Sequence, residues 1–216
     1  MLDPYLNRNY SMSYMFTNGP FSHTGIKADI SLGGKNTFMV GMSNPTDYRS
    51  APSMPKSFIA QFSTASKNDK LKAYFNFVGG KQSASKNVTQ GDIVATYTVT
   101  SKFSIGVNGT LQSVKLTDST GKSKTSNWSG AALYLNVDPV NWFGLTLRAE
   151  YIGDKDEYLG LKNVFAPTLS ANFKIDNLTI IPEFRLDKTG NAIFYKDATT
   201  QTASTASFII AATYHF

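Results

Sequence analysis

The chain has 216 residues, of which 41% are hydrophobic, a mean hydropathy of −0.21 and a formal net charge of +6 at pH 7. No stretch reaches the 18 or more apolar residues of a membrane-spanning helix, which excludes a helical membrane protein. Cysteine is absent, which excludes disulfides, thiolate catalysis and zinc sites built on sulfur. The lysines are scattered along the connections and do not gather on one face, so no nucleic-acid partner is predicted.

Alternation of apolar and polar residues with a period of two predicts β-strands along almost the whole chain. The candidate strands are Tyr10–Phe16, Ile26–Leu32, Thr37–Ser43, Ser57–Ser63, Leu71–Phe77, Asp92–Val99, Phe103–Val114, Ser129–Val137, Leu145–Tyr151, Thr168–Ile175, Leu178–Asp187 and Thr205–Phe216. The first is the weakest. These segments predict an all-β chain with one domain over 1–216, in which 1–25 form an N-terminal loop or first strand and 26–216 form barrel strands.

The connections between these segments alternate in length. Short ones are expected at 33–36, 65–70, 100–102, 138–142 and 176–177, and long ones at 44–55, 78–91, 115–127, 153–167 and 188–204. Short turns on one rim and long loops on the other are typical of a transmembrane antiparallel up-and-down β-barrel of the outer membrane.

The tightest predicted turn, at Asp176 and Asn177, sets a register. A two-residue hairpin loop there places Ile175 opposite Leu178 on an apolar face. The register then continues through the pairs Phe173 with Ile180, Ala171 with Pro182 and Leu169 with Phe184. Because Pro182 donates no ladder hydrogen bond, it predicts a bulge or a local break.

Three features favour a membrane barrel over a soluble sandwich. Aromatic residues stand at segment ends, where barrel strands cross the lipid interfaces. Eleven or twelve strands enclose more volume than inward apolar side chains can fill. The terminal Phe216, preceded by apolar residues at every second position, resembles the C-terminal signal by which outer-membrane barrels reach their insertion machinery. The predicted interface aromatics are Trp128, Trp142, Phe143, Tyr151, Tyr214 and Phe216.

The N-terminal stretch "DPYLNRNYSMSYMFTNGPFSHTGIKADI" resembles a segment of the OmpL-like β-barrel porin family. The matching positions are Asn7, Arg8, Asn9, Ser11, Ser13, Tyr14, Phe16, Pro20, Phe21, His23, Thr24 and Gly25. The resemblance implies a Gram-negative outer-membrane barrel in which this segment is an extracellular loop able to fold inward and further strands lie upstream. If Tyr10–Phe16 is a strand, twelve close the barrel; otherwise eleven remain and at least one is missing, since such barrels carry even strand numbers.

Other motifs give weaker readings. Gly121, Lys122 and Ser123 look like the tail of a phosphate-binding loop, but Leu116 stands where that motif needs glycine. Asp154–Glu157 looks like the start of a calcium loop, yet it lacks the glycine and glutamate that such a loop requires. No metal, cofactor or catalytic residue is therefore predicted, and the protein is not expected to be an enzyme.

The leading functional hypothesis is a porin, a passive diffusion channel for small solutes or ions. Its predicted inward charges are Lys27, Asp29, Lys72, Asp92, Arg148, Glu150, Lys174, Glu183, Arg185 and Asp187. Because both signs are equally represented, strong ion selectivity is not expected. The alternative is a structural or docking subunit of a larger outer-membrane complex with a plugged lumen, and a third reading is a soluble carbohydrate-binding β-protein.

The expected surroundings follow from this reading. They are outer-membrane lipid, the barrel insertion machinery acting through the C-terminal strand, and an envelope protein complex as a further candidate partner. The start of the chain has no basic segment followed by an apolar run, so no signal peptide is visible. The solute, the oligomeric state and the number of upstream strands stay open.

Overall fold

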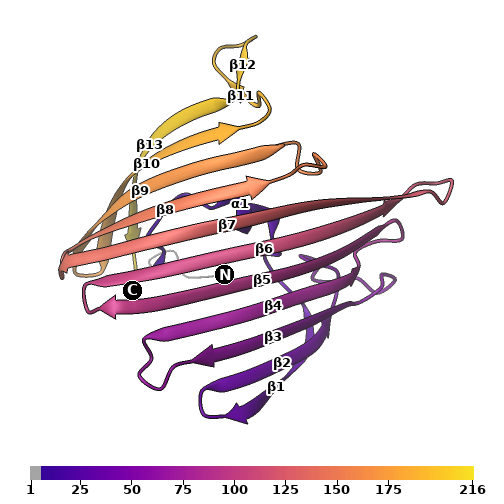
Figure 1. The fold of residues 1–216 in the computed structure, drawn as a ribbon, viewed down its shortest axis with the longest axis horizontal. Helices are drawn as coiled ribbons and strands as arrows, with labels where there is room; N and C mark the ends of the chain where they lie inside the picture. The colour runs from indigo at the N-terminus through magenta and orange to yellow at the C-terminus, as the bar shows by residue number, and fades with distance from the viewer. Residues whose placement is uncertain (1–5) are drawn as a thin grey trace.

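The computed structural model describes residues 6–216 and places eleven antiparallel strands in one curved sheet (Figure 1). The spatial order of the strands is their order in the chain, so the topology is up-and-down. The strands of the sheet are β1 (Gly25–Gly33), β2 (Asn36–Ser43), β3 (Ser57–Ala65), β4 (Leu71–Lys81), β5 (Lys86–Thr100), β6 (Phe103–Thr117), β7 (Ser123–Val140), β8 (Phe143–Gly153), β9 (Asn163–Ile175), β10 (Leu178–Thr189) and β13 (Ser204–Tyr214).

Three shorter elements complete the described chain. β11 (Phe194–Tyr195) and β12 (Gln201–Thr202) pair into a hairpin that projects beyond the sheet (Figure 1). The helix α1 (Tyr14–Asn18) precedes β1. Within residues 6–216, no helix has the length and apolar character needed to cross a membrane.

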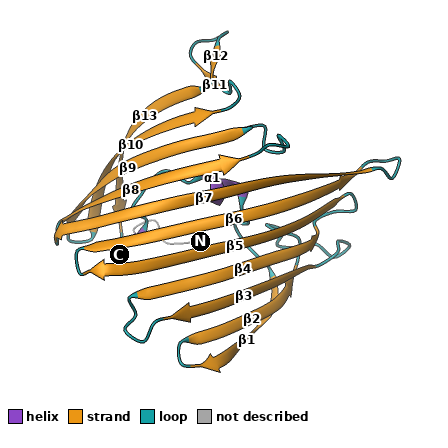
Figure 2. Cartoon of the chain, viewed as in Figure 1, coloured by secondary structure: helices purple, strands orange, loops and turns teal. Residues whose placement is uncertain are grey.

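Short turns lie at one end of the strands and longer loops at the other, as predicted (Figure 2). Two of the expected long loops are nevertheless short, because their flanking strands extend past the predicted ends. The β4–β5 connection is reduced to 82–85 and the β6–β7 connection to 118–122. The remaining long connections, 44–56, 154–162 and the stretch that holds β11 and β12, form the loop end of the sheet.

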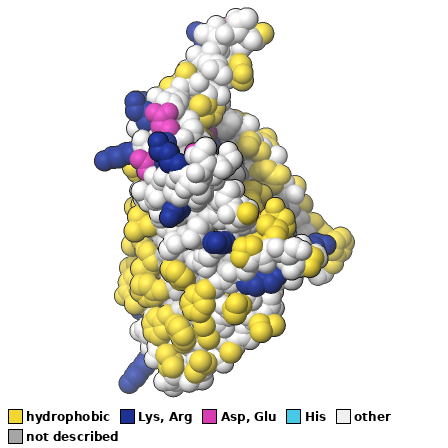
Figure 3. Space-filling view, turned by 90° about the vertical axis from the view of Figure 1, so that its right-hand side faces the viewer, with side chains coloured by type: hydrophobic (Ala, Val, Ile, Leu, Met, Phe, Trp, Pro, Cys, Tyr) yellow, Lys and Arg dark blue, Asp and Glu magenta, His cyan; other side chains and the backbone are white. Residues whose placement is uncertain are grey.

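The two faces of the sheet differ in polarity, as the period of two predicts. Along β8, the outward Leu145, Leu147 and Tyr151 are exposed, whereas the inward Arg148 and Glu150 are buried. Seen from the loop end (Figure 3), hydrophobic side chains cover much of the outer flank. An apolar outer face and a polar inner face are the arrangement of a membrane barrel.

The predicted hairpin register is confirmed. Ile175 pairs with Leu178, Phe173 with Ile180 and Leu169 with Phe184, and Asp176 takes the left-handed conformation at φ 51°. The pairing of β9 with β10 is interrupted between Ile180 and Glu183. Pro182 sits in that gap, because its ring nitrogen has no hydrogen to give to the ladder.

The sheet does not close. β1 and β13 stand at its two edges, and no strand of the described chain pairs with their outer sides. Because neighbouring strands alternate in direction and eleven are present, β1 and β13 run in the same direction. Closure that keeps every pair antiparallel therefore requires an odd number of further strands between them.

The predicted strand over Tyr10–Phe16 is wrong. These residues run along the concave side of the sheet and end in α1, whose N-cap Ser13 accepts a hydrogen bond from the Phe16 amide at 3.0 Å. Met15, on the buried side of α1, packs with Trp128, Ile152 and other side chains of the inner sheet surface. Gly130 makes room for this contact, since a Cβ there would lie 2.5 Å from Met15 Cγ.

Candidate functional site

The lumen is the concave face of the sheet, and the N-terminal residues 6–24, here called the inserted segment, cross it. The inward faces of β7–β10, called the charged wall, hold this segment. Glu183 accepts hydrogen bonds from the amides of Tyr10 and Ser11 at 2.8 and 2.9 Å. Glu150 accepts from the amides of Tyr14 and Met15, both at 2.8 Å. Each carboxylate thus satisfies two backbone donors that no sheet or helix partner would otherwise meet.

Two arginines of the charged wall bind the carbonyls of the same segment. Arg148 donates to the Ser11 carbonyl at 2.8 Å, and Arg185 donates to the Met12 carbonyl at 2.7 Å. Arg185 also pairs with Asp187 through bonds of 2.9 and 3.0 Å. Arg148 and Glu150 are 3% and 0% exposed, so these charged groups contact the inserted segment and do not face the open lumen.

A third anchor lies nearer the short-turn end. Arg8 forms two hydrogen bonds with Asp138, at 3.0 and 2.9 Å, and a third with the Thr146 hydroxyl at 2.8 Å. A paired contact of this kind fixes both the position and the orientation of the guanidinium group. A Cβ at Gly144 would lie 2.4 Å from Asp138 Oδ1, so glycine at this position leaves space for the pair.

Tyr14, in the inserted segment, completes the contact with the charged wall. The Arg185 guanidinium carbon lies 4.9 Å from the centre of the Tyr14 ring, which is a cation–π contact. Burial, with a smaller contribution from Asp187, raises the pKa of Tyr14 to about 12. The phenol is therefore uncharged at every physiological pH.

The inward faces of β3–β6, called the amide wall, have a different chemistry. Gln61 donates to Asn76 at 2.6 Å, and Asn76 donates to Asp92 at 2.9 Å. Asn108 donates to the other carboxylate oxygen of Asp92 at 2.7 Å. Farther toward the loop end, the Gln112 side chain donates to Oε1 of Gln90 at 2.8 Å. Neutral amides thus dominate this wall, with one carboxylate among them.

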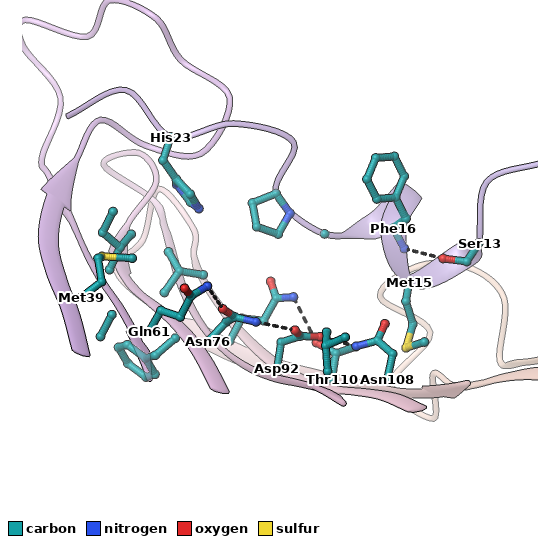
Figure 4. A pocket seen from close by; sticks show the side chains of 18 of the residues that line it. Ser13, Met15, Phe16, His23, Met39, Gln61, Asn76, Asp92, Asn108 and Thr110 are labelled. Carbon is teal, nitrogen blue, oxygen red and sulfur yellow. Dashed lines mark hydrogen bonds between the residues drawn. The ribbon is translucent and has the colours of Figure 1, made fainter. Parts of the chain in front are cut away.

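A cavity of about 470 Å³ separates the amide wall from α1 (Figure 4). Its floor carries Gln61, Asn76 and Asp92, while Phe16 and His23 stand on its other side. The inserted segment therefore contacts the charged wall directly and leaves open space on the amide side. The lumen is narrowed on one side and not filled.

The structure divides the ten predicted lumen charges into two groups. Arg148, Glu150, Glu183, Arg185 and Asp187 lie together on the charged wall beneath the inserted segment. The others are dispersed: Lys174 lies 3.4 Å from Asp138 near the short turns, Lys27 pairs with Asp29 at 2.9 Å on β1, Lys72 stands at the start of β4, and Asp92 lies on the amide wall.

The aromatic residues predicted at the membrane interface differ in their exposure. Trp142, Tyr151, Tyr214 and Phe216 are exposed, and Phe143 packs with its ring centre 5.1 Å from that of Phe173. The prediction that Trp128 lies at the membrane interface is wrong. Trp128 is 2% exposed, faces the lumen and donates a hydrogen bond to Gln112 at 2.9 Å. The period places it inward because Trp128 pairs with the inward Gln112, whereas its chain neighbour Ser129 faces out.

Several contact residues were not predicted from the sequence. They are Arg8 and Ser11 of the inserted segment, Asp138 of β7, which binds Arg8, and the amides of the amide wall that orient Asp92. The amides carry a visible signal, because they stand at alternate positions of neighbouring strands. The partners of Arg8 could not be recognised from the sequence, since Asp138 lies 130 positions away in the chain.

Solved outer-membrane proteins have a similar fold. The outer-membrane channel DcaP of Acinetobacter baumannii matches with a TM-score of 0.65 and 9% identity, over 97% of this chain and 67% of that one. The anion-selective porin from Comamonas acidovorans matches with 0.59 and 12%, over 84% and 52%. The porin NanC matches with 0.53 and 11%, over 90% and 93%. The chain thus spans about half the length of the anion-selective porin.

At such low identity these matches show a shared fold and no more. No curated protein matches the sequence. The family described as "Putative beta-barrel porin-2, OmpL-like" matches residues 1–216, the whole of the chain. With this match added to the antiparallel sheet, its apolar outer face and its polar lumen, the chain belongs to the OmpL-like β-barrel porin family.

Proposed function

We propose that the protein is a passive diffusion channel of the outer membrane whose lumen is narrowed on one side by the inserted segment. Membership in a porin family indicates embedding in the Gram-negative outer membrane and favours a non-enzymatic role. The observation that carries the proposal is the cavity between α1 and the amide wall. It leaves open space along β3–β6, with Gln61, Asn76 and Asp92 on its floor, beside a segment that is fixed to β7–β10.

The test is conduction by the full-length protein in a planar lipid bilayer. We expect discrete openings with wild-type protein and a larger single-channel conductance after deletion of residues 9–18, because the deletion removes α1 and the backbone amides that Glu183 and Glu150 hold in the lumen. Deletion of residues 196–200, which connect β11 and β12 outside the lumen, serves as the control and should leave conductance unchanged. Folding of each variant is checked by its heat-modifiable mobility on a gel.

The second candidate is a structural or docking subunit of an envelope complex, with a sealed lumen. The observation that favours it is the number of direct contacts that fix the inserted segment, which resemble those of a permanent plug. A folded protein that conducts neither before nor after the deletion would sink the channel proposal. That result would leave the docking role as the better one.

Delivery to the insertion machinery through β13 is a further part of the proposal. It is supported by the alternation of outward Phe208, Ile210 and Tyr214 that ends at the exposed Phe216. Deletion of Phe216 should lower the amount of assembled barrel in cells much more than it lowers the stability of barrel already folded. Replacement of Phe216 by Tyr, which keeps a terminal ring, should preserve assembly. Equal assembly of the deletion variant and the wild type would show that the ring is not read as a signal.

A further inference from the structure

The amide wall directs its hydrogen bonds toward one carboxylate. The donors run from Gln61 to Asn76 and from Asn76 to Asp92, while Asn108 donates to Asp92 from the other side (Figure 4). Both oxygens of Asp92 therefore accept one bond from a neutral side chain, at 2.9 and 2.7 Å. A carboxylate offers about four acceptor sites, so two remain for a passing solute. The amides hold the group in place without neutralising it.

Among the residues that line the cavity, Asp92 is the one carboxylate, and no lysine or arginine is present. His23 is the other titratable side chain of the lining except for the Tyr134 phenol. Burial lowers the pKa of His23 below its ordinary value, against a smaller opposite effect of Asp47. His23 is therefore uncharged above neutral pH, and the cavity carries a formal charge of −1.

The other lumen charges lie outside the lining of this cavity. The nearest along the amide wall is Lys72, which stands at the start of β4, four positions before Asn76. Arg148 and Arg185, the inward arginines of the charged wall, donate to carbonyls on the far side of the inserted segment. Lys27 is paired with Asp29 at 2.9 Å, and Arg8 is paired with Asp138. The sequence predicts equal numbers of positive and negative charges in the lumen, but a solute in the cavity beside the amide wall meets one negative charge.

We infer that Asp92 determines the ion selectivity of the channel and makes it prefer small cations, including organic ammonium ions, over anions. The inference rests on the proposed channel function and names the solute class of the same cavity. The carboxylate supplies the field, and the amide oxygens of its neighbours supply neutral contacts that do not trap a cation. A path of this kind discriminates by charge while binding weakly enough to let the ion leave.

The expected size of the effect follows from Coulomb's law. An ion that passes about 6 Å from a unit charge in a water-like medium changes about threefold in local concentration, upward for a cation and downward for an anion. The two changes together favour cations by about tenfold. Salt screens this field over about 10 Å at 0.1 M, so the preference is largest in dilute salt.

The experiment is the reversal potential of full-length protein in a planar bilayer under a potassium chloride gradient at pH 7.5. We expect wild type to prefer potassium, Asp92→Asn to lose most of that preference, and Asp92→Lys to prefer chloride. Asp92→Asn keeps the shape of the side chain and an acceptor for one neighbouring amide. Asp197→Asn, which removes the same formal charge from the exposed β11–β12 hairpin, should behave like wild type.

Two different failures can be told apart. Absence of conductance from wild type overturns the proposed channel itself. Conductance with the same reversal potential in wild type, Asp92→Asn and Asp92→Lys leaves the channel intact and overturns the role of Asp92. An equal shift in Asp197→Asn also overturns it, because the effect would then come from total charge and not from the path.

Discussion

The charged wall and the amide wall are built from strands of the same sheet and share the same apolar outer face, yet their inner faces act differently. On β7–β10, carboxylates and guanidinium groups bind the backbone of the inserted segment. On β3–β6, amides bind one another and Asp92, and a cavity stays open beside them. Charge in a lumen therefore does not by itself mark a solute path, because charged groups are also the strongest anchors for a buried segment.

The largest expected effect concerns the outer face, where the two walls should be equivalent. Leu147 on β8 and Ile93 on β5 face outward with the same 39% exposure. Leu147→Arg and Ile93→Arg should each lower the free energy of unfolding in lipid vesicles by about 2–4 kcal/mol, since each puts a charge into the hydrocarbon layer. Val94→Arg, which faces the cavity next to Ile93, is the control and should cost little. An arginine penalty at Val94 as large as that at Ile93 would contradict the assignment of the two faces.

Next in size is the loss of an anchor on the charged wall. Glu150→Gln removes the charge from the acceptor of two hydrogen bonds donated by the Tyr14 and Met15 amides. The free energy that holds α1 against the charged wall should fall by about 1–3 kcal/mol. Amide hydrogen exchange in a peptide covering residues 8–18 should then speed up tenfold or more. Asp92→Asn, which removes a carboxylate from the amide wall, should leave that exchange rate unchanged. Similar exchange in both variants would mean that the segment is not held by the charged wall.

Two glycines on opposite faces of the sheet test whether α1 rests on the inner face. Gly130→Ala puts a Cβ 2.5 Å from Met15 Cγ on the inner face. Gly91 on β5 faces outward, since it pairs with the exposed Leu111, and a Cβ there meets nothing within 4 Å. Gly130→Ala should cost about 1–3 kcal/mol of unfolding free energy through overpacking. Gly91→Ala should be neutral or slightly stabilising. Urea titrations of both variants in the same vesicles provide the measurement, and equal midpoints would show that α1 does not rest on Gly130.

The smallest effect is one of pH and involves Tyr14 alone. Because its pKa is raised to about 12 from an ordinary value of 10, the stability it contributes is complete below pH 10 and is lost as the pH rises toward 12. Hydrogen exchange in residues 8–18 should accelerate over this range in wild type. Tyr14→Phe keeps the ring that contacts Arg185 but has no proton to lose, so its acceleration should be smaller. Identical pH profiles would rule out a titrating role for the phenol.

Most of the fold was predictable because its signals are local. The period of two placed the strands, Asp176 and Asn177 placed a turn and its register, and Pro182 placed the break in the β9–β10 ladder. The same period misled at residues 10–16, where Tyr10, Met12, Tyr14 and Phe16 alternate as in a strand. Within residues 6–216, no strand pairs with that backbone, and the carboxylates of Glu183 and Glu150 accept hydrogen bonds from its amides.

The sequence alone determines the antiparallel strands and which of their faces is apolar, and it predicts ten inward charges. Only the tertiary structure decides which of these charges a solute can meet. The reason is physical: the hydrogen bonds between Glu150 and Tyr14, and between Glu183 and Tyr10, join residues 136 and 173 positions apart. Contacts over such separations leave no periodic trace in the chain. They exist only because the curved sheet brings the charged wall around the segment while the amide wall stays beyond its reach.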